Sequence, residues 1–145
     1  MKKMNGMLAM ACIAAMIACD SGKRVTAEKL IGRWKIVEVN GKAVKAERAF
    51  FKFVKEGNTL RLHGNAGCNL MNTETEFDAK QPSSLSFSEP RVTIMDCPDL
   101  ETESKILDAF EKVTQVKPGQ SEKQLHLADK NGKSMLTLDE RSRHE

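Results

Sequence analysis

Two hydrophobic periodicities determine what this chain can fold into. Most of it alternates apolar and polar residues in short runs separated by glycine-containing turns, which is the pattern of half-buried β-strands. The segment from Asp99 to Val113 departs from this pattern, because its apolar residues recur at spacings of three, four and seven, the period of one helical face. About seven strands and one amphipathic helix predict an α+β domain in which a strongly curved antiparallel sheet wraps partly around the helix.

The expected strands cover residues 30–39, 50–54, 60–63, 84–88, 92–95, 124–127 and 133–138. Asn40-Gly41 and the run from Asp129 to Gly132 are typical hairpin turns. Pro98 suits the first turn of the helix, and Asp96 is available as its cap. The acidic side chains of the helix, Glu103 among them, are interpreted as a solvated face.

The first nineteen residues have the composition of a bacterial lipoprotein signal peptide. Lys2 and Lys3 precede an uncharged, mostly apolar run of twelve residues from Met7 to Ala18. This run is too short to span a bilayer, which takes about 20 helical residues. Met16 to Cys19 reads as a lipobox, so we expect cleavage before Cys19 and lipid on its thiol. Cys12 is the competing thiol but would leave a much shorter apolar segment, and an ordinary secretory peptide with soluble release is the other alternative.

The remaining chain divides into a tether over residues 20–27, one domain over residues 28–139 and a polar tail over residues 140–145. The whole chain has 23 basic and 20 acidic residues, and removal of Lys2 and Lys3 with the signal peptide leaves 21 and 20. A mature chain so close to neutral offers no electrostatic reason to expect nucleic acid as a partner. The expected location is the cell envelope, with the chain held on a bacterial membrane by its N-terminal lipid.

Cys68 and Cys97 are the two cysteines that remain once Cys12 is removed and Cys19 is acylated. An even pair in an exported domain favours a disulfide. The alternatives are a zinc site, a catalytic thiol or two free buried cysteines. Zinc takes four ligands, and neither cysteine has a further Cys or His at the usual spacing. His63 could form a thiol–imidazole pair with Cys68, but it falls on the polar face of its strand and no third orienting group is apparent.

The most unusual stretch runs from Gly64 to Asn69. Gly64 and Gly67 permit left-handed or tightly bent backbone, and Asn69 can hold such a bend through side-chain hydrogen bonds. We interpret the stretch as a structural corner, with a ligand-contacting loop as the alternative. The chain has no phosphate-binding glycine loop and no nucleophile elbow. We therefore expect no enzymatic activity, no metal and no cofactor.

Several motifs, in order along the chain, resemble those of the META domain (HslJ-like) family. They are Leu30-Ile31-Gly32-Arg33-Trp34 at the start, then Gly64 with Gly67-Cys68-Asn69, and then Thr93-Ile94-Met95-Asp96-Cys97. Glu103 and Phe110 fall where the family has its helix, and residues 125–138 match its closing hairpin. Asp96 departs from the small residue that is usual there, and residues 69–72 lack the family's frequent glycine. The resemblance covers residues 28–139.

The resemblance implies a curved antiparallel sheet packed on a helix, a place at the cell envelope and an association with stress tolerance. It implies no reaction. The favoured hypothesis is a non-enzymatic envelope lipoprotein that binds a protein partner or a small apolar ligand. A pocket lined by Phe51, Phe53, Leu62 and Phe110 could hold an acyl chain, with ordinary core as the alternative for these residues. The other hypotheses are a thiol-dependent enzyme that uses Cys68 and a passive structural or inhibitory module.

Overall fold

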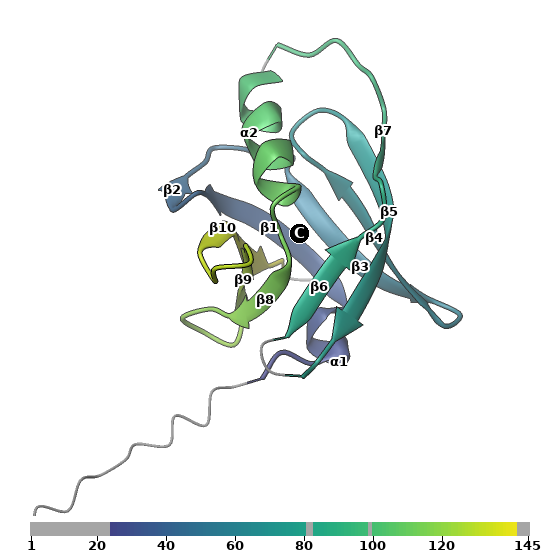
Figure 1. The fold of residues 1–145 in the computed structure, drawn as a ribbon. Helices are drawn as coiled ribbons and strands as arrows, with labels where there is room; N and C mark the ends of the chain where they lie inside the picture. The colour runs from purple at the N-terminus through teal and green to yellow at the C-terminus, as the bar shows by residue number, and fades with distance from the viewer. Residues whose placement is uncertain (1–23, 81–82, 99, 142–145) are drawn as a thin grey trace, which may run out of the picture.

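The structure, a computed structural model, describes residues 24–80, 83–98 and 100–141 (Figure 1). The expected signal peptide, its lipidated Cys19, the competing Cys12 and most of the tether lie outside the described residues. So does the tail beyond Arg141. In the part of the chain that is described, no helix is both long enough and apolar enough to cross a bilayer.

Two helices and ten strands make up the described chain. The helices are α1 (Ala27–Leu30) and α2 (Leu100–Phe110). The strands are β1 (Gly32–Val39), β2 (Lys42–Ala43), β3 (Phe50–Glu56), β4 (Thr59–Asn65), β5 (Leu70–Asp78), β6 (Ser84–Phe87), β7 (Arg91–Val92), β8 (Gln115–Pro118), β9 (Gln124–Ala128) and β10 (Ser134–Glu140). The long helix therefore lies within the expected range of residues 99–113.

The sheet closes on itself, and this corrects the expected open, curved sheet of about seven strands. All its pairings are antiparallel, in the order β10-β9-β8-β6-β5-β4-β3-β1, and β1 also pairs with β10. Eight strands thus form a barrel, with β2 beside β1 and β7 beside β5. Closure satisfies the hydrogen-bonding groups that an open sheet would expose along its two edges. An α+β description holds loosely, because the molecule is mostly β with one substantial helix.

Strands β5 and β8 were not among the expected strands, and the reason for β5 is chemical. Its inward positions alternate as Met71, Thr73 and Thr75, all buried. Two threonines in three inward positions hide the apolar alternation that marks a strand in sequence. Thr73 is accommodated because its hydroxyl donates to the carbonyl of Ser88 at 2.6 Å. The strand expected over residues 92–95 is also shorter, since β7 ends at Val92.

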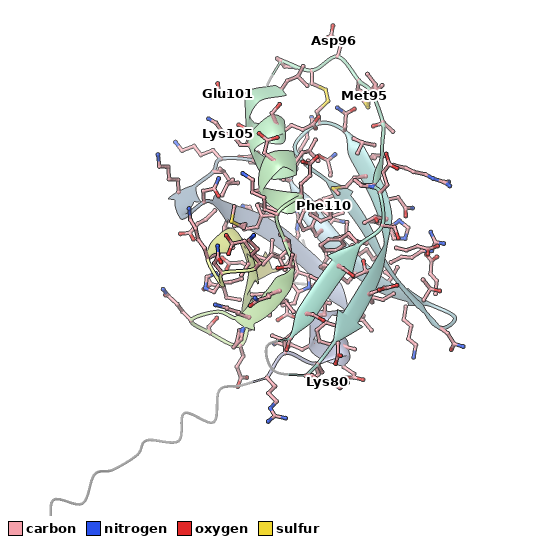
Figure 2. The ribbon with its side chains drawn as sticks, in the orientation of Figure 1. Lys80, Met95, Asp96, Glu101, Lys105 and Phe110 are labelled. Atoms are coloured by element: carbon pink, nitrogen blue, oxygen red, sulfur yellow. A yellow bond between two sulfur atoms is a disulfide. The ribbon has the colours of Figure 1, made fainter. Side chains whose placement is uncertain are left out.

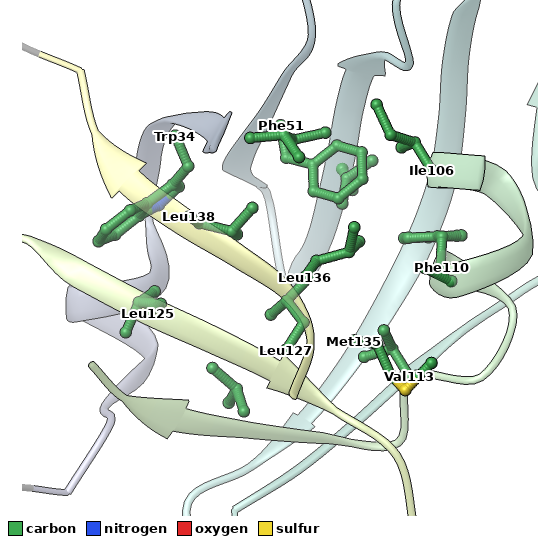
Figure 3. Packing of buried hydrophobic residues seen from close by; sticks show 14 of the residues in the cluster. Trp34, Phe51, Ile106, Phe110, Val113, Leu125, Leu127, Met135, Leu136 and Leu138 are labelled. Carbon is green, nitrogen blue, oxygen red and sulfur yellow. The ribbon is translucent and has the colours of Figure 1, made fainter. Parts of the chain in front are cut away.

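The core fills the barrel interior, and α2 covers one end of it (Figures 1 and 3). Ile106, Ala109 and Phe110 of α2 are buried. The ring of Phe110 lies 5.4 Å from that of Phe51 and 4.3 Å from that of Phe87, measured between centroids. Figure 3 shows Phe51, Phe110, Leu136 and Leu138 directed into this interior.

The acyl-chain pocket expected between sheet and helix is not formed. Its four proposed lining residues, Phe51, Phe53, Leu62 and Phe110, belong to the packed core and are 0–3% exposed. Aromatic rings in edge contact leave no room for a further apolar chain. These residues form part of the hydrophobic core of the barrel.

The two ends of the barrel differ. At one end, α1 lies beside the β3–β4 hairpin, where Ala27 and Ile31 share a hollow with Lys55, Asn58 and Thr59. Val25, in the expected tether, is already buried there, and Trp34 Nε1 donates to the Leu30 carbonyl at 2.9 Å. At the other end lie α2, the β4–β5 turn and the connection from β7 to α2 (Figure 1). We call these the α1 end and the α2 end.

Candidate functional site

A buried carboxylate organises the α2 end. The side chain of Glu103 is in α2 and the residue is only 5% exposed. Its Oε2 accepts hydrogen bonds from the backbone N–H groups of Cys68 at 2.9 Å and Asn69 at 2.6 Å, and its Oε1 accepts from Asn69 Nδ2 at 2.5 Å. Helix α2 is thereby joined to the β4–β5 turn through one side chain. This corrects the interpretation of the acidic helix residues as a solvated face.

The hydrogen bonds decide the protonation of Glu103. Burial alone raises the pKa of this carboxyl, but the N–H groups of Asn69 and Cys68 stabilise the charged form and outweigh it, so the pKa is lowered from its ordinary value. Glu103 is therefore an ionised acceptor and not a proton donor at neutral pH.

Asn69 carries the connection onward to the segment after β7. Its Oδ1 accepts from the Thr93 hydroxyl at 3.1 Å and from the Met95 backbone N–H at 2.8 Å. The Thr93 hydroxyl in turn accepts from the Leu70 N–H at 3.0 Å. Asn69 is buried, so both ends of its amide have partners inside the protein. One asparagine thus joins the turn, the helix and the connecting segment.

A disulfide links the same segments covalently. Cys68 and Cys97 are bonded, with a sequence separation of 29 and their Cα atoms 6.2 Å apart. This confirms the pairing favoured from the sequence. Cys68 has no free thiol in this form, and His63 instead contacts Glu56 Oε1 at 3.1 Å and Asn72 at 3.0 Å. A thiol–imidazole pair is not assembled.

The two motif glycines, Gly64 and Gly67, are needed for different reasons. Gly67 has φ of +135°, which a residue with a side chain rarely adopts, as expected for the corner. Gly64 is different, because it lies inside β4 and is not among the positive-φ residues. A Cβ added there would lie 2.9 Å from Phe51 Cδ1 and 3.0 Å from Met71 Cγ. Gly64 is therefore required by close packing inside the barrel, and the expectation of a bent backbone at this position is wrong.

Apolar side chains surround this braced region and face solvent. Ile94 is 99% exposed, Leu70 54%, Met95 53% and Leu100 44%. Figure 2 shows Met95 at the far end of the molecule from Lys80. The disulfide, Asn69 and Thr93 hold the backbone on which these side chains stand. Isolated exposed apolar residues are common, whereas grouped ones are a feature of interaction sites in general.

A hollow of about 400 Å³ adjoins these residues. It is lined by Phe50, His63, Gly64, Leu70, Met71, Asn72, Arg91, Val92 and Thr93. Leu70 lines the hollow and also belongs to the exposed group, and so does Val92, which is 37% exposed. We call Leu70, Val92, Ile94 and Met95, together with this hollow, the apolar surface of the α2 end.

The potentially reactive side chains of this region are engaged with groups inside the protein. Its one buried carboxylate is saturated with hydrogen-bond donors, and its two cysteines are bonded to each other. Across the described ranges, no cluster of three or more His, Cys, Asp or Glu side chains could hold a metal ion. The structure brings together Gly67, Cys68, Asn69, Thr93, Met95 and Cys97 at the α2 end. Gly64 lies nearby in β4 and lines the hollow, whereas the motif from Leu30 to Trp34 lies at the α1 end.

Glu103 is the residue of this region that the sequence argument misassigned. The position of Glu103 in the sequence nevertheless indicates that its side chain is buried. Glu103 precedes Ile106 by three residues and Phe110 by seven, so it shares the helical face that both of these buried residues occupy. An acidic residue on the apolar face of a helix requires buried donors, and the N–H groups of the Cys68-Asn69 turn provide them.

Of three comparisons with known proteins, the one with protein families gives a match. The family model described as META domain matches residues 28–142. No curated protein and no solved structure matches the chain.

Proposed function

The chain belongs to the META domain family, and from this premise we propose that it is a non-enzymatic lipoprotein of the bacterial cell envelope. Lipid on Cys19 holds it to a membrane. The domain binds an envelope protein through the apolar surface of the α2 end and contributes to stress tolerance. Binding of a small apolar ligand in the hollow by Leu70 is the alternative use of the same surface.

One observation carries the binding proposal: the apolar side chains of the α2 end are exposed on a backbone that is braced. Ile94 is fully exposed, while the adjacent Met95 N–H is bonded to buried Asn69. Rigid apolar groups lose little conformational entropy on binding, which favours affinity. The disulfide supports this proposal over a thiol-dependent enzyme, since catalysis by Cys68 needs a thiolate.

The direction of the surface also supports a protein partner. The described chain begins beside α1, at the end of the barrel opposite Met95 (Figures 1 and 2). A lipid attached upstream of Arg24 would hold the α1 end near the membrane and leave the α2 end facing away from it. A partner in the envelope could then reach Ile94 and Met95 without obstruction.

The test is affinity isolation of the full-length protein from detergent-solubilised envelopes of the native cell. We compare wild type with the double variant Ile94→Asp and Met95→Asp, and use Ile31→Asp as the matched control. Ile31 is also an exposed apolar residue, 40% exposed, but lies at the α1 end. We expect one envelope protein to be recovered with wild type and with Ile31→Asp, and to be lost with the double variant.

An unchanged set of recovered proteins in the double variant would overturn the binding proposal. Melting temperatures of all three proteins are measured first, because exposed positions should leave stability unchanged within about 0.5 kcal/mol. The lipid anchor has its own test. Cells grown with a clickable palmitate should label the wild-type protein and not Cys19→Ser, and an unlabelled wild type released into the medium would contradict it.

A further inference from the structure

A row of polar residues, three of them Arg or Lys, crosses the outside of the barrel. Residues that face one another on successive strands are Arg33 of β1, Lys52 of β3, His63 of β4, Asn72 of β5 and Arg91 of β7. Their neighbours Trp34, Phe51, Phe53, Leu62 and Met71 are buried, so by strand alternation the row itself lies on the outer face. With adjacent strands about 4.8 Å apart, the row extends over about 19 Å.

More cations lie at the β1 end of this row. Arg33, Lys35, Arg48 and Arg141 line a hollow of about 640 Å³ together with Glu47, Phe50 and Asn65. The Arg33 guanidinium stacks on the Phe50 ring, 3.7 Å from its centroid. Phe50 also lines the apolar hollow next to Leu70. We call Arg33, Lys35, Arg48, Lys52 and Arg141 the cationic face.

The charges of this face are not balanced from within the described chain. Elsewhere on the barrel Arg61 is paired with both Glu56 and Glu74, and His63 is paired with Glu56. None of the five residues of the cationic face has a carboxylate within ion-pair distance in residues 24–80, 83–98 and 100–141. Glu47 lines the same hollow without pairing, and Asp139 opposite Lys35 accepts from Gln124.

Direct cross-strand placement of Arg33 and Lys52 is unfavourable for the isolated domain, because like charges that face one another across two strands repel. The contact with the Phe50 ring stabilises Arg33 in this place, but the described residues supply no carboxylate that offsets its repulsion with Lys52. An anionic surface in contact with the cationic face would attract Arg33 and Lys52 and offset their mutual repulsion. It would also release the counterions bound to these side chains.

The position of the cationic face in the chain indicates which anionic surface it contacts. Arg33 is the second residue of β1, three residues after α1 ends at Leu30. Between Cys19 and Arg24 the chain can span at most about 17 Å, at 3.3–3.6 Å per residue. A lipid on Cys19 would therefore keep the start of the domain, and Arg33 with it, close to the membrane.

We propose that the cationic face lies against anionic phospholipid headgroups of the membrane that anchors the chain, with Phe50 among the cations at the contact. The inference rests on the proposed lipid anchor. It adds a second contact that orients the barrel, because a single flexible attachment point leaves the domain free to rotate. The oriented domain would present Ile94 and Met95 in one fixed direction relative to that membrane.

The experiment measures how fast an amine-reactive reagent modifies individual lysines of the full-length lipidated protein. The protein is reconstituted in vesicles of phosphatidylcholine alone or of phosphatidylcholine with phosphatidylglycerol. We expect modification of Lys35 and Lys52 to slow by about threefold or more in the anionic vesicles, with added salt restoring the rate. Lys105 and Lys112, at the α2 end, should be modified equally in both.

Two double variants test whether the cationic face causes this difference in rate. Arg33→Gln with Arg48→Gln removes two of its charges and should abolish the difference at Lys35 and Lys52. Lys42→Gln with Lys130→Gln removes two exposed charges elsewhere and should preserve it. Equal rates in the two vesicle types, for protein that carries acyl groups, would overturn the proposal.

Two further outcomes are distinguishable. The mass of the N-terminal peptide in the same digests reports acylation, so an unmodified Cys19 refutes the anchor and, with it, this proposal. Protection of Lys35 and Lys52 by soluble polyglutamate or duplex DNA, but not by anionic vesicles, would assign the face to a different anionic partner and overturn the membrane contact.

Discussion

At the scale of single residues, Glu103 is the clearest case of a side chain whose role depends on what folds against it. A buried carboxylate without donors would be strongly destabilising. Here three N–H groups point at it, two of them from consecutive backbone positions. The charge therefore stabilises the turn that presents Leu70 and, through Asn69, the segment that presents Ile94 and Met95.

The first prediction concerns the charge of Glu103. Replacing it by glutamine places an amide N–H₂ group against donors, so we expect Glu103→Gln to lower the free energy of unfolding by about 2–3 kcal/mol. Glu101→Gln on the same helix is the control, since Glu101 pairs with Lys105 at the exposed surface and such a pair contributes little. Urea unfolding measures both, and equal losses would refute a special role for Glu103.

The second prediction follows from its lowered pKa. The folded state holds the pKa of Glu103 below its value in the unfolded chain, about 4.3. Its contribution to stability is therefore complete above that value and is lost as pH falls through the lowered folded pKa. Wild type should therefore keep its advantage over Glu103→Gln above about pH 4.3 and lose it progressively as the pH falls below that value. An advantage that persists undiminished at the acid limit would show that the carboxylate charge is not what stabilises.

At the scale of elements, the β7–α2 connection is an irregular segment made rigid by its attachments. It is exposed, yet the disulfide fixes Cys97 and Asn69 fixes Thr93 and Met95. Helix α2 then packs Phe110 into the barrel. The apolar surface of the α2 end is therefore presented by the turn and the connection, and helix α2 holds both in place through Glu103.

The third prediction tests the covalent attachment. Closing a loop of 29 residues stabilises a domain by about 3–4 kcal/mol in the chain-entropy model, so Cys68→Ala with Cys97→Ala should cost about that much. Hydrogen exchange of residues 93–97 should also accelerate more than that of β3 and β4. Reduction of the wild-type disulfide is the matched control and should reproduce both effects. Unchanged exchange in 93–97 would mean that the hydrogen bonds alone hold the segment.

At the scale of the whole molecule, barrel closure sets the order of stability around the wall. β1 and β10, the first and the last strands, pair through five facing residue pairs. The β6–β8 junction is much shorter, with Ser84 facing Gln115 and flanking hydrogen bonds from Leu85 to Thr114 and from Val116 to Ser83. The barrel therefore has one weak seam.

The fourth prediction is that the barrel opens first at this seam. Local opening is cheapest where the fewest hydrogen bonds must break. Amides of Leu85 and Val116 should exchange faster than amides of β1 and β10, although Leu85, Val116, Ile36 and Leu138 are all equally buried. Native-state hydrogen exchange measured by NMR resolves the two groups. Identical protection would indicate that the barrel opens only as a whole.

Much of this architecture was readable from local pattern. The alternation of Leu125 and Leu127, the turns at Asn40-Gly41 and Asp129–Gly132, and the amphipathic run to Phe110 each predict one element, and each is confirmed. These signals are local because strand and helix periods depend on which side of a single element is buried. The sequence also favours the Cys68–Cys97 pairing, because each of the two cysteines expected in the mature domain has only the other as a partner.

Other features were decided only when distant segments met. Closure of the sheet depends on β1 reaching β10, more than a hundred residues apart in places, and no local pattern reports which edges pair. Glu103 is a buried acceptor because the Cys68-Asn69 turn supplies its donors. Phe51 and Phe110 belong to the core because their rings pack against each other. Local residue patterns specify the periods of the elements and the motifs of the family, whereas contacts between elements decide which polar groups are buried and which apolar groups remain exposed. The physical reason is that burial and hydrogen-bond satisfaction belong to pairs of segments, and a single segment does not specify its partner.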